Sequence, residues 1–363
     1  MDELEYLCSD EKRERMSTIF HYPEYLTGEE LDDYLSRGWF RMQQAIFTCR
    51  YLFQEGMLST AVWLRLPLHS YQFSKSLRKL MRKNYNEFEV TIGPAVIDAE
   101  KELLFSRYKD NFKGMLSDSL YHSLGLGREN IIYSSMQTEV RKDGKLLAFS
   151  IFDCGEEAIQ SVSGIYDPEF SMYSLGLFTM LLEVEYAKDH QYEYFYPGYI
   201  APGRPVFEYK LRTKGSEFYD PETSSWFPIE HLERDGLPSS QMDIALNFLI
   251  EELTEFHVDC EKYIYPPHQV IASNPRRSHF FSAPIFLDCF YFYPLKERVL
   301  AEYDPITEKY RVGRYFPFRD LEDRFFSEKE GLNKQFFLLM RILDDVYETY
   351  DATEAAEYIA TLC

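Results

Sequence analysis

The sequence predicts an α+β protein in which helices flank a mixed β-sheet, with an additional α+β region at the C-terminal end. Three observations predict this class. Residues 88–214 read in order as strand, helix, several meandering strands, helix, strand and strand. Asp143-Gly144 separates two strand-like runs and is a strong hairpin signal. The apolar stretch 173–188 is too long for an ordinary strand and predicts a helix.

The N-terminal part begins with a predicted helix. Thr27 is a suitable N-cap, Glu30 completes a capping box, and Gly38 is a suitable stop. Residues 39–53 are aromatic and β-leaning, and residues 61–68 read as a strand ended by a proline.

The remaining elements follow the same reasoning. A basic helix over residues 74–84 precedes, in order, the strand 88–92, the helix 96–110, the strands 131–140, 145–153 and 157–166, the helix 173–188, and the strands 192–196 and 207–212. Beyond residue 215 the sequence predicts a helix within 241–260, β-structure over 285–303, and one or two acidic amphipathic helices over 329–363. We divide the chain into residues 1–70, 71–230 and 231–363, the last an acidic extension of unknown role.

The charge is unevenly distributed. The 363 residues carry 39 Lys and Arg against 60 Asp and Glu, a net charge of −21 that would repel nucleic acid if spread evenly. Residues 36–214, however, hold 22 bases against 21 acids, and no acid occurs from Gly56 to Asn86. That acid-free stretch contains Arg65, Lys75, Arg78, Lys79, Arg82 and Lys83. Helical spacing gives the last five one broad basic face, which is either a phosphate-binding surface or a solvated helix face.

Composition excludes several classes of protein. With 29 Tyr and 29 Phe, the chain is not disordered. The six cysteines are dispersed without a C-x-x-C pair, which argues against a zinc or iron–sulfur site. The first residues lack the apolar core of a signal peptide, and no stretch approaches 18 uncharged apolar residues. We therefore expect a cytoplasmic protein that contacts no membrane.

Five segments, in order, resemble the arginyl-tRNA–protein transferase family, which includes bacterial leucyl-transferring relatives. They are LDDYLSRGWFR (31–41), Phe73 and Ser76 with Arg82-Lys83-Asn84, Tyr166 to Gly176 with Glu183 to Ala187, YFYPGYIAPGRPVFEYK (194–210), and Pro221 with Trp226. The resemblance spans about residues 25–230.

The chain also departs from the family pattern. Members usually carry clustered N-terminal cysteines linked to an iron–sulfur cluster, whereas Cys49 is the only cysteine between residues 9 and 153. Arg204 or a neighbour replaces the cysteine of the fourth segment, and Leu77 replaces a glutamine in the second. The C-terminal third matches nothing in the family. We therefore expect no cluster and no other cofactor.

The resemblance implies a GNAT-like core, a mixed sheet split between two central strands where donor and acceptor meet. It implies transfer of an amino acid, Arg or Leu, from charged tRNA to the N-terminal amine of an acceptor protein, often one beginning with Asp or Glu, which marks that protein for degradation (the N-degron pathway). The partners would be aminoacyl-tRNA and acceptor N-termini, with no DNA. Because the reaction is aminolysis of an activated ester, it requires no metal and no covalent intermediate.

The resemblance also suggests site residues. The catalytic candidates are Tyr166, Ser174, Gly176, Glu183 and Lys210; the tRNA-binding candidates are Arg65, Lys75, Ser76, Arg78, Lys79, Arg82 and Lys83; and the cleft candidates are Tyr173, Leu175, Tyr196, Tyr199 and Tyr209. Gly176 would let a substrate approach the start of the long helix, and Lys210 would contact the acceptor carboxylate or the tRNA end. Asp153 is a further candidate proton acceptor. The alternative interpretation of each is an ordinary helix start, a core aromatic residue or a surface charge.

Two other functions fit the same sequence. One is a GNAT-type N-acyltransferase that uses acyl-CoA, although only one glycine stands where that class carries a glycine-rich pyrophosphate loop. The other is a non-catalytic adaptor that binds protein N-termini or a partner through its acidic C-terminal region.

Overall fold

The computed structural model describes residues 18–54, 56–112, 116–128, 130–268, 280–292, 296–318, 334–344 and 346–362. It divides into two compact units. The core unit comprises Phe20–Thr48 and Ala61–Leu232, and the C-terminal unit comprises Met1–Ile19, Cys49–Thr60 and Glu233–Cys363. Of the boundaries expected from the sequence, the one after residue 70 falls inside the core unit, and the one after residue 230 lies two residues before the end of that unit.

The core unit is built on an eight-stranded sheet in the order β13-β12-β6-β11-β10-β9-β8-β7. Its strands are β6 (Val62–Pro67), β7 (Glu89–Pro94), β8 (Ser135–Lys142), β9 (Lys145–Cys154), β10 (Ala158–Tyr166), β11 (Tyr194–Ile200), β12 (Glu217–Asp220) and β13 (Ser225–Pro228). Neighbouring strands in this sheet run antiparallel except β10 and β11, which are parallel. The predicted mixed sheet is confirmed.

The parallel pair separates soon after it begins. β10 and β11 pair at three positions, the last being Gln160 opposite Tyr196. Beyond that point β10 stays with β9 as far as Tyr166, while β11 stays with β6 as far as Ile200. Both strands also carry an irregularity in register just after the pairing ends. The sheet is therefore split between its two central strands, as the GNAT-like expectation requires; we call this opening the split.

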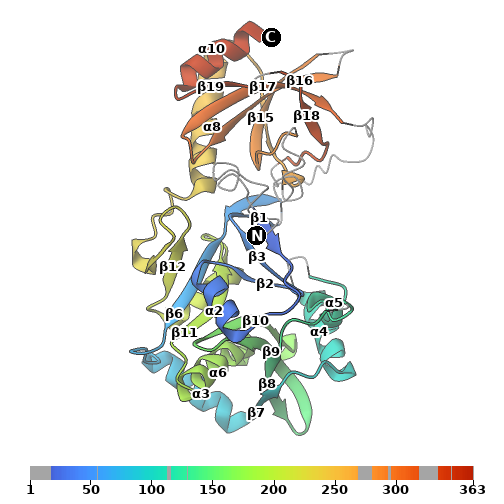
Figure 1. The fold of residues 1–363 in the computed structure, drawn as a ribbon, viewed down its shortest axis with the longest axis vertical. Helices are drawn as coiled ribbons and strands as arrows, with labels where there is room; N and C mark the ends of the chain where they lie inside the picture. The colour runs from blue at the N-terminus through green and yellow to red at the C-terminus, as the bar shows by residue number, and fades with distance from the viewer. Residues whose placement is uncertain are drawn as a thin grey trace. The chain divides into compact units, whose positions relative to one another are not determined.

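Helices cover both faces of this sheet (Figure 1). On one face lie α3 (Lys75–Glu87) and α6 (Leu175–Asp189), and on the other lie α4 (Ala99–Asn111) and α5 (Leu120–Ser123). The alternation of β9 explains both layers, because Phe152 packs in the α6 cluster and its neighbour Ile151 in the α4 cluster. Short elements complete the unit: η1 (Pro168–Tyr173), α7 (Pro205–Glu208), η2 (Tyr209–Thr213) and η3 (Ile229–His231).

The predicted strand over residues 207–212 is wrong. The chain there forms α7 and η2, with Pro205 in the first turn of α7. A proline fits that position because its missing N–H has no partner in the first turn of a helix. The aromatic residues that suggested a strand are thereby carried on a helical segment beside the split.

The N-terminal part of the core unit holds α2 (Gly28–Ser36) and the sheet of β1 (Thr18–His21), β3 (Ala45–Cys49) and β2 (Phe40–Met42). The predicted capping box between Thr27 and Glu30 is present. Asp32 of α2 accepts hydrogen bonds from the amides of Glu156 and Glu157 at 2.8 and 2.7 Å. A Cβ atom on Gly155 would lie 1.9 Å from the Asp32 carboxylate, so this turn requires glycine.

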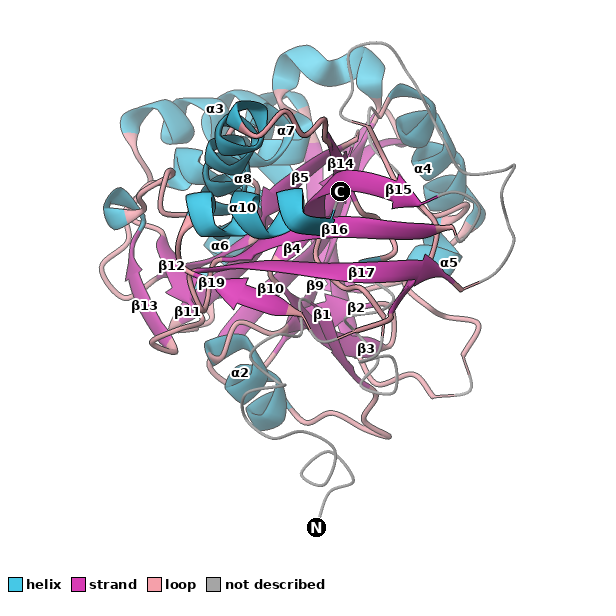
Figure 2. Cartoon of the chain, turned by 90° about the horizontal axis from the view of Figure 1, so that it is seen from above, coloured by secondary structure: helices cyan, strands magenta, loops and turns pink. Residues whose placement is uncertain are grey.

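The C-terminal unit contains a second, antiparallel sheet of β14 (Glu261–Ile264), β15 (Ile285–Phe292), β16 (Glu297–Asp304), β17 (Lys309–Pro317) and β18 (Met340–Ile342), with β19 (Tyr347–Thr349) also on β17. The helices α8 (Pro238–Glu255) and α10 (Ala352–Leu362) pack on one face of it (Figure 2). The hairpin of β4 (Tyr51–Gln54) and β5 (Met57–Thr60) belongs to the same unit.

Two expectations about this unit are corrected. The helix expected within 241–260 is α8, which begins earlier, at Pro238. The helices expected over 329–363 are wrong where β18 and β19 occur, and residues 329–333 lie outside the described residues. Among the described residues, no helix is long and apolar enough to cross a membrane.

Candidate active site

The split exposes the middle of the core sheet. Residues 146–153 of β9 are buried, yet Ser161 to Gly164 on the neighbouring β10 are only half-buried. A central strand is ordinarily covered on both edges, and here its β11 edge is open beyond Gln160. Backbone and hydroxyl groups of β10 are therefore accessible at this point, which suits a site that must hold a carbonyl group.

Lys210 stands at the β11 side of the split. Its ammonium donates a hydrogen bond of 2.8 Å to the carbonyl of Tyr199, and the rings of Tyr199 and Phe207 lie 5.4 and 5.9 Å from it. Gly198 adopts a φ of +84°, and a Cβ there would lie 3.4 Å from the ammonium nitrogen. Desolvation lowers the pKa of Lys210 to about 7. The side chain can therefore gain and lose a proton near neutral pH.

Glu183 lies in the middle of α6 and is fully buried. Neither carboxyl oxygen has a hydrogen-bond partner among the described residues. Burial raises its pKa to about 8, an effect that the nearby hydroxyls of Ser150 and Ser161 moderate and the charge of Asp153 increases. At neutral pH the protonated form is therefore favoured. Glu185, two residues along the helix, is half-buried and hydrogen-bonds Tyr85 instead.

Tyr209 joins these groups electrostatically. Its pKa is raised first by desolvation and then by the ionisable groups of Tyr108, Glu183 and Tyr166. Tyr166 ends β10, and its ring contacts that of Tyr108 at 5.2 Å between centroids. Of the predicted site residues, Tyr166 and Glu183 thus raise the pKa of Tyr209. The sequence did not indicate Tyr108 of α4 as a site residue, because an aromatic residue within a helical pattern is ordinarily part of the core.

The start of α6 has a different role from the one expected. A Cβ on Gly176 would lie 3.1 Å from the Tyr166 ring, so the protein's own tyrosine occupies the approach expected for a substrate. Ser174 has a φ of 53° and joins η1 to α6, and its side chain makes no capping hydrogen bond. Gly176 is therefore explained by its packing against Tyr166, and Ser174 by the turn between η1 and α6.

The cleft candidates separate into two groups. Tyr199 and Tyr209 lie at the split. Leu175 and Tyr196 do not line it, because they are 0% and 2% exposed within the core. Tyr173 packs against Phe88 at the end of α3. These three are corrections to the expected cleft, and they follow from the tendency of strand and helix-start aromatics to be buried.

The basic helix forms one exposed face. Lys75, Arg78, Lys79, Arg82 and Lys83 are exposed, as is Ser76, while Leu77, Met81 and Asn84 point into the core. None of the five bases forms an ion pair with an acid in the part of the chain that the structure describes. These charges are available to an anionic ligand.

Arg65 does not belong to that face. It forms an ion pair of 2.7 Å with Glu217, and its guanidinium lies 4.4 Å from the ring of Tyr194 and 4.6 Å from that of Trp226. Because its guanidinium is paired with Glu217 and stacked on two aromatic rings, Arg65 is a structural residue of β6. The expectation that Arg65 contacts tRNA is therefore wrong.

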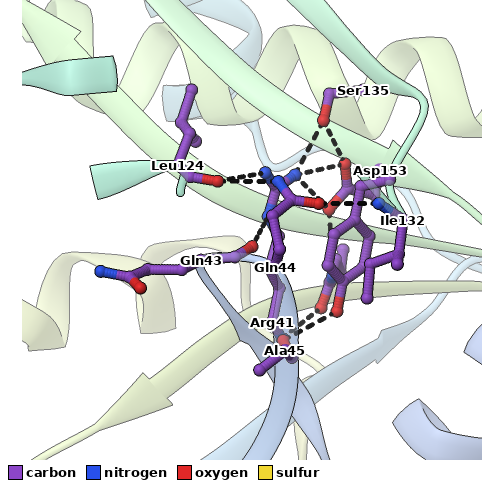
Figure 3. Close-up of polar contacts among 10 residues, drawn as sticks. Arg41, Gln43, Gln44, Ala45, Leu124, Ile132, Ser135 and Asp153 are labelled. Atoms are coloured by element: carbon purple, nitrogen blue, oxygen red, sulfur yellow. Dashed lines mark hydrogen bonds and ion pairs between the residues drawn. The ribbon is translucent and has the colours of Figure 1, made fainter. Parts of the chain in front are cut away.

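A buried network stands where the pairing of β10 and β11 ends (Figure 3). Arg41, from the first family-like segment, binds Asp153 at 2.9 and 3.0 Å, with both side chains almost fully buried. Ser135 donates to Asp153 at 2.6 Å and Gln160 at 3.0 Å. Because both oxygens of Asp153 are occupied, it is not available as a proton acceptor. The network instead ties β2 to β8, β9 and β10.

No group of three or more His, Cys, Asp or Glu residues within the described ranges is arranged to hold a metal ion. Among the described cysteines, Cys154 and Cys260 are free thiols. Cys8 and Cys363 lie outside the described residues.

Comparison with solved structures gives weak overall likenesses. A conserved protein of unknown function from Bacteroides thetaiotaomicron superposes with a TM-score of 0.33 at 14% identity, over 58% of this chain and 70% of that one. A GCN5-related N-acetyltransferase from Anabaena variabilis gives 0.31 at 10% identity, over 57% and 45%.

Comparison of sequences is more informative. The model of the family "Arginine-tRNA-protein transferase, C terminus" matches residues 96–220. An aspartate/glutamate leucyltransferase of Leptospira interrogans is 28% identical over 232 residues, covering 61% of this chain and 88% of the relative. One from Campylobacter jejuni is 28% identical over 214 residues, covering 57% and 87%. Together with the split sheet and the five family-like segments, these matches support an aminoacyltransferase of the arginyl-tRNA–protein transferase family, which includes leucyl-transferring relatives.

Proposed function

We propose that this chain transfers leucine from leucyl-tRNA to the α-amine of proteins that begin with Asp or Glu. The observation that carries the proposal is the similarity to aspartate/glutamate leucyltransferases over 88% and 87% of their lengths. Both relatives are leucyltransferases, which favours leucine over arginine as the transferred amino acid.

The split supports the chemistry. The attacking α-amine must be neutral, so that its nitrogen can form a bond to the ester carbon. The bond from that carbon to the ribose oxygen then breaks, and the proton lost by the amine is transferred to the released ribose hydroxyl. Lys210, with a pKa near 7, is suited to accept the amine proton and return it to the leaving oxygen. Accessible groups of β10 would hold the carbonyl oxygen.

The exposed face of α3 is the proposed seat of the tRNA backbone. Its five exposed bases lie on the same side of the core sheet as α6. Phosphate contacts position a nucleic acid and release counterions, so binding through this face depends strongly on salt.

The proposed reaction takes its energy from the ester and therefore needs no cofactor. We place it in the cytoplasm, where aminoacyl-tRNA is made, and we expect the modified proteins to enter N-terminus-dependent degradation.

The test is a transfer assay with radiolabelled leucyl-tRNA or arginyl-tRNA and peptides that begin with Asp, Glu or Ala. Leucine should reach the Asp and Glu peptides and not the Ala peptide. Lys210→Met should abolish the pH dependence near 7 and lower the rate at least tenfold, within the usual range for a lost acid–base group. Arg212→Met, an exposed change on the same η2 segment, is the matched control. Absence of product from both tRNAs would refute the proposal.

A further inference from the structure

The C-terminal unit contains a pocket whose walls lie outside residues 96–220 and include no residue of the split. The space between its walls is about 520 Å³, a volume that includes open solvent. Its walls come from the β3–β4 junction, α8, the segment around residue 283, and the β16–β17 turn. Tyr51, Met242 and Glu302 in these walls are each less than 10% exposed, so the pocket is held by the core of its own unit.

His268 contributes a buried, neutral side chain to the wall of this pocket. The residue is 3% exposed, and its Nδ1 lies against the carbonyl of Ser282. Because a carbonyl can only accept, we assign the proton to Nδ1, which leaves a lone pair on Nε2. Nε2 has no partner among the described residues, and burial lowers the pKa of His268 to about 4, so the ring stays neutral. The wall of the pocket therefore carries no charge at His268, and the charges that line the pocket come from other residues.

Two opposite charges line the same pocket. Arg50 is half-buried and forms no ion pair with a described acid. One oxygen of Asp304 accepts the amide of Ile306 at 3.0 Å, which leaves the other oxygen open. Both residues line the pocket, as does Tyr51. Glu302 is already paired, at 2.8 Å, with Arg311.

We propose that this pocket binds a free α-amino acid. The carboxylate would bind Arg50, the ammonium would bind Asp304, and the side chain would contact Met242 and Ile306. An α-amino acid carries both charged groups on one carbon, so a single small molecule can pair with both residues. The buried walls favour a small molecule over a polypeptide chain. None of these residues belongs to the split.

The test is calorimetric titration of the full chain with each L-amino acid at millimolar concentration. The N-acetyl and amide derivatives of the best binder serve as probes that each lack one charge. We expect measurable binding of at least one free amino acid and no detectable binding of either derivative. Binding of the derivatives as tightly as the parent, or binding only of peptides, would overturn the proposal, as would no binding of any amino acid.

Variants locate the site. Arg50→Met should weaken binding at least tenfold, the usual range for a hydrogen bond to a charged group. Asp304→Asn should weaken it similarly and keep the contact with the amide of Ile306, so that folding is preserved. Arg341→Met, an exposed arginine on β18 of the same unit, should change nothing. Equal affinity of the Arg50 and Arg341 variants would refute this assignment.

Discussion

Glu183→Gln tests the buried carboxyl of α6 through its effect on stability. In the folded chain burial raises the pKa of Glu183 from 4.5 to about 8, so the native state keeps a proton that the unfolded state has released. Between these two values the native state binds more protons than the unfolded state, and stability therefore falls as pH rises. The slope is about 1.4 kcal/mol per pH unit, which accumulates to about 5 kcal/mol between pH 4.5 and 8. Glutamine has the same shape and does not titrate, so this loss should disappear in the variant.

The assay is urea unfolding of both proteins from pH 5 to pH 9, followed by tryptophan fluorescence. The three tryptophans, Trp39, Trp63 and Trp226, all lie in the core unit and report on it. The difference in free energy of unfolding between the variant and the wild type should grow steadily in favour of glutamine up to about pH 8. Glu185→Gln, two residues along the same helix, is the matched control for a Glu-to-Gln change in α6. A difference that stays flat with pH would show that Glu183 does not titrate in this range.

Three further predictions concern the core unit. Gly155→Ala should destabilise it by about 2–4 kcal/mol in the same urea assay, because the new methyl group meets the α2 carboxylate at 1.9 Å; a loss below 1 kcal/mol would mean that α2 moves freely. Arg41→Met should cost about 3–5 kcal/mol by leaving Asp153 buried without its partner, and adding Asp153→Asn should recover part of that loss; a double variant no better than the single one contradicts this account. Lys79→Ala with Arg82→Ala should weaken tRNA binding and reduce the slope of log K against log salt by about 2, and an unchanged slope would place the phosphates elsewhere.

Local signals predicted much of the fold. The hairpin at Asp143-Gly144 forms with both residues at positive φ, 51° and 78°, which the two-residue turn requires. The capping box at Thr27 and the long apolar helix depend equally on neighbouring residues, and both are present. Such elements can be predicted because the residues that determine them lie within a few positions of one another in the sequence.

The site was less predictable because it depends on distant partners. Arg41 and Asp153 are separated by 112 positions, and no local pattern indicates that each satisfies the other. Gly176 was correctly singled out as a place of close approach, but only the structure reveals that Tyr166 is what approaches it. Likewise the basic composition of residues 56–86 cannot distinguish the exposed Lys79 from Arg65, whose partner Glu217 comes from another strand.

The division of the chain has a consequence for its synthesis. The hairpin Cys49–Thr60 leaves the core unit and completes the C-terminal unit, whose remaining described part begins at Glu233. At ordinary translation rates the residues between them take roughly 10–35 s to make. During that time Tyr51 and Leu52, buried in the finished protein, lack the helix α8. A chain stopped after residue 232 would keep this hairpin without its partners, so the last third cannot be removed cleanly by a single cut.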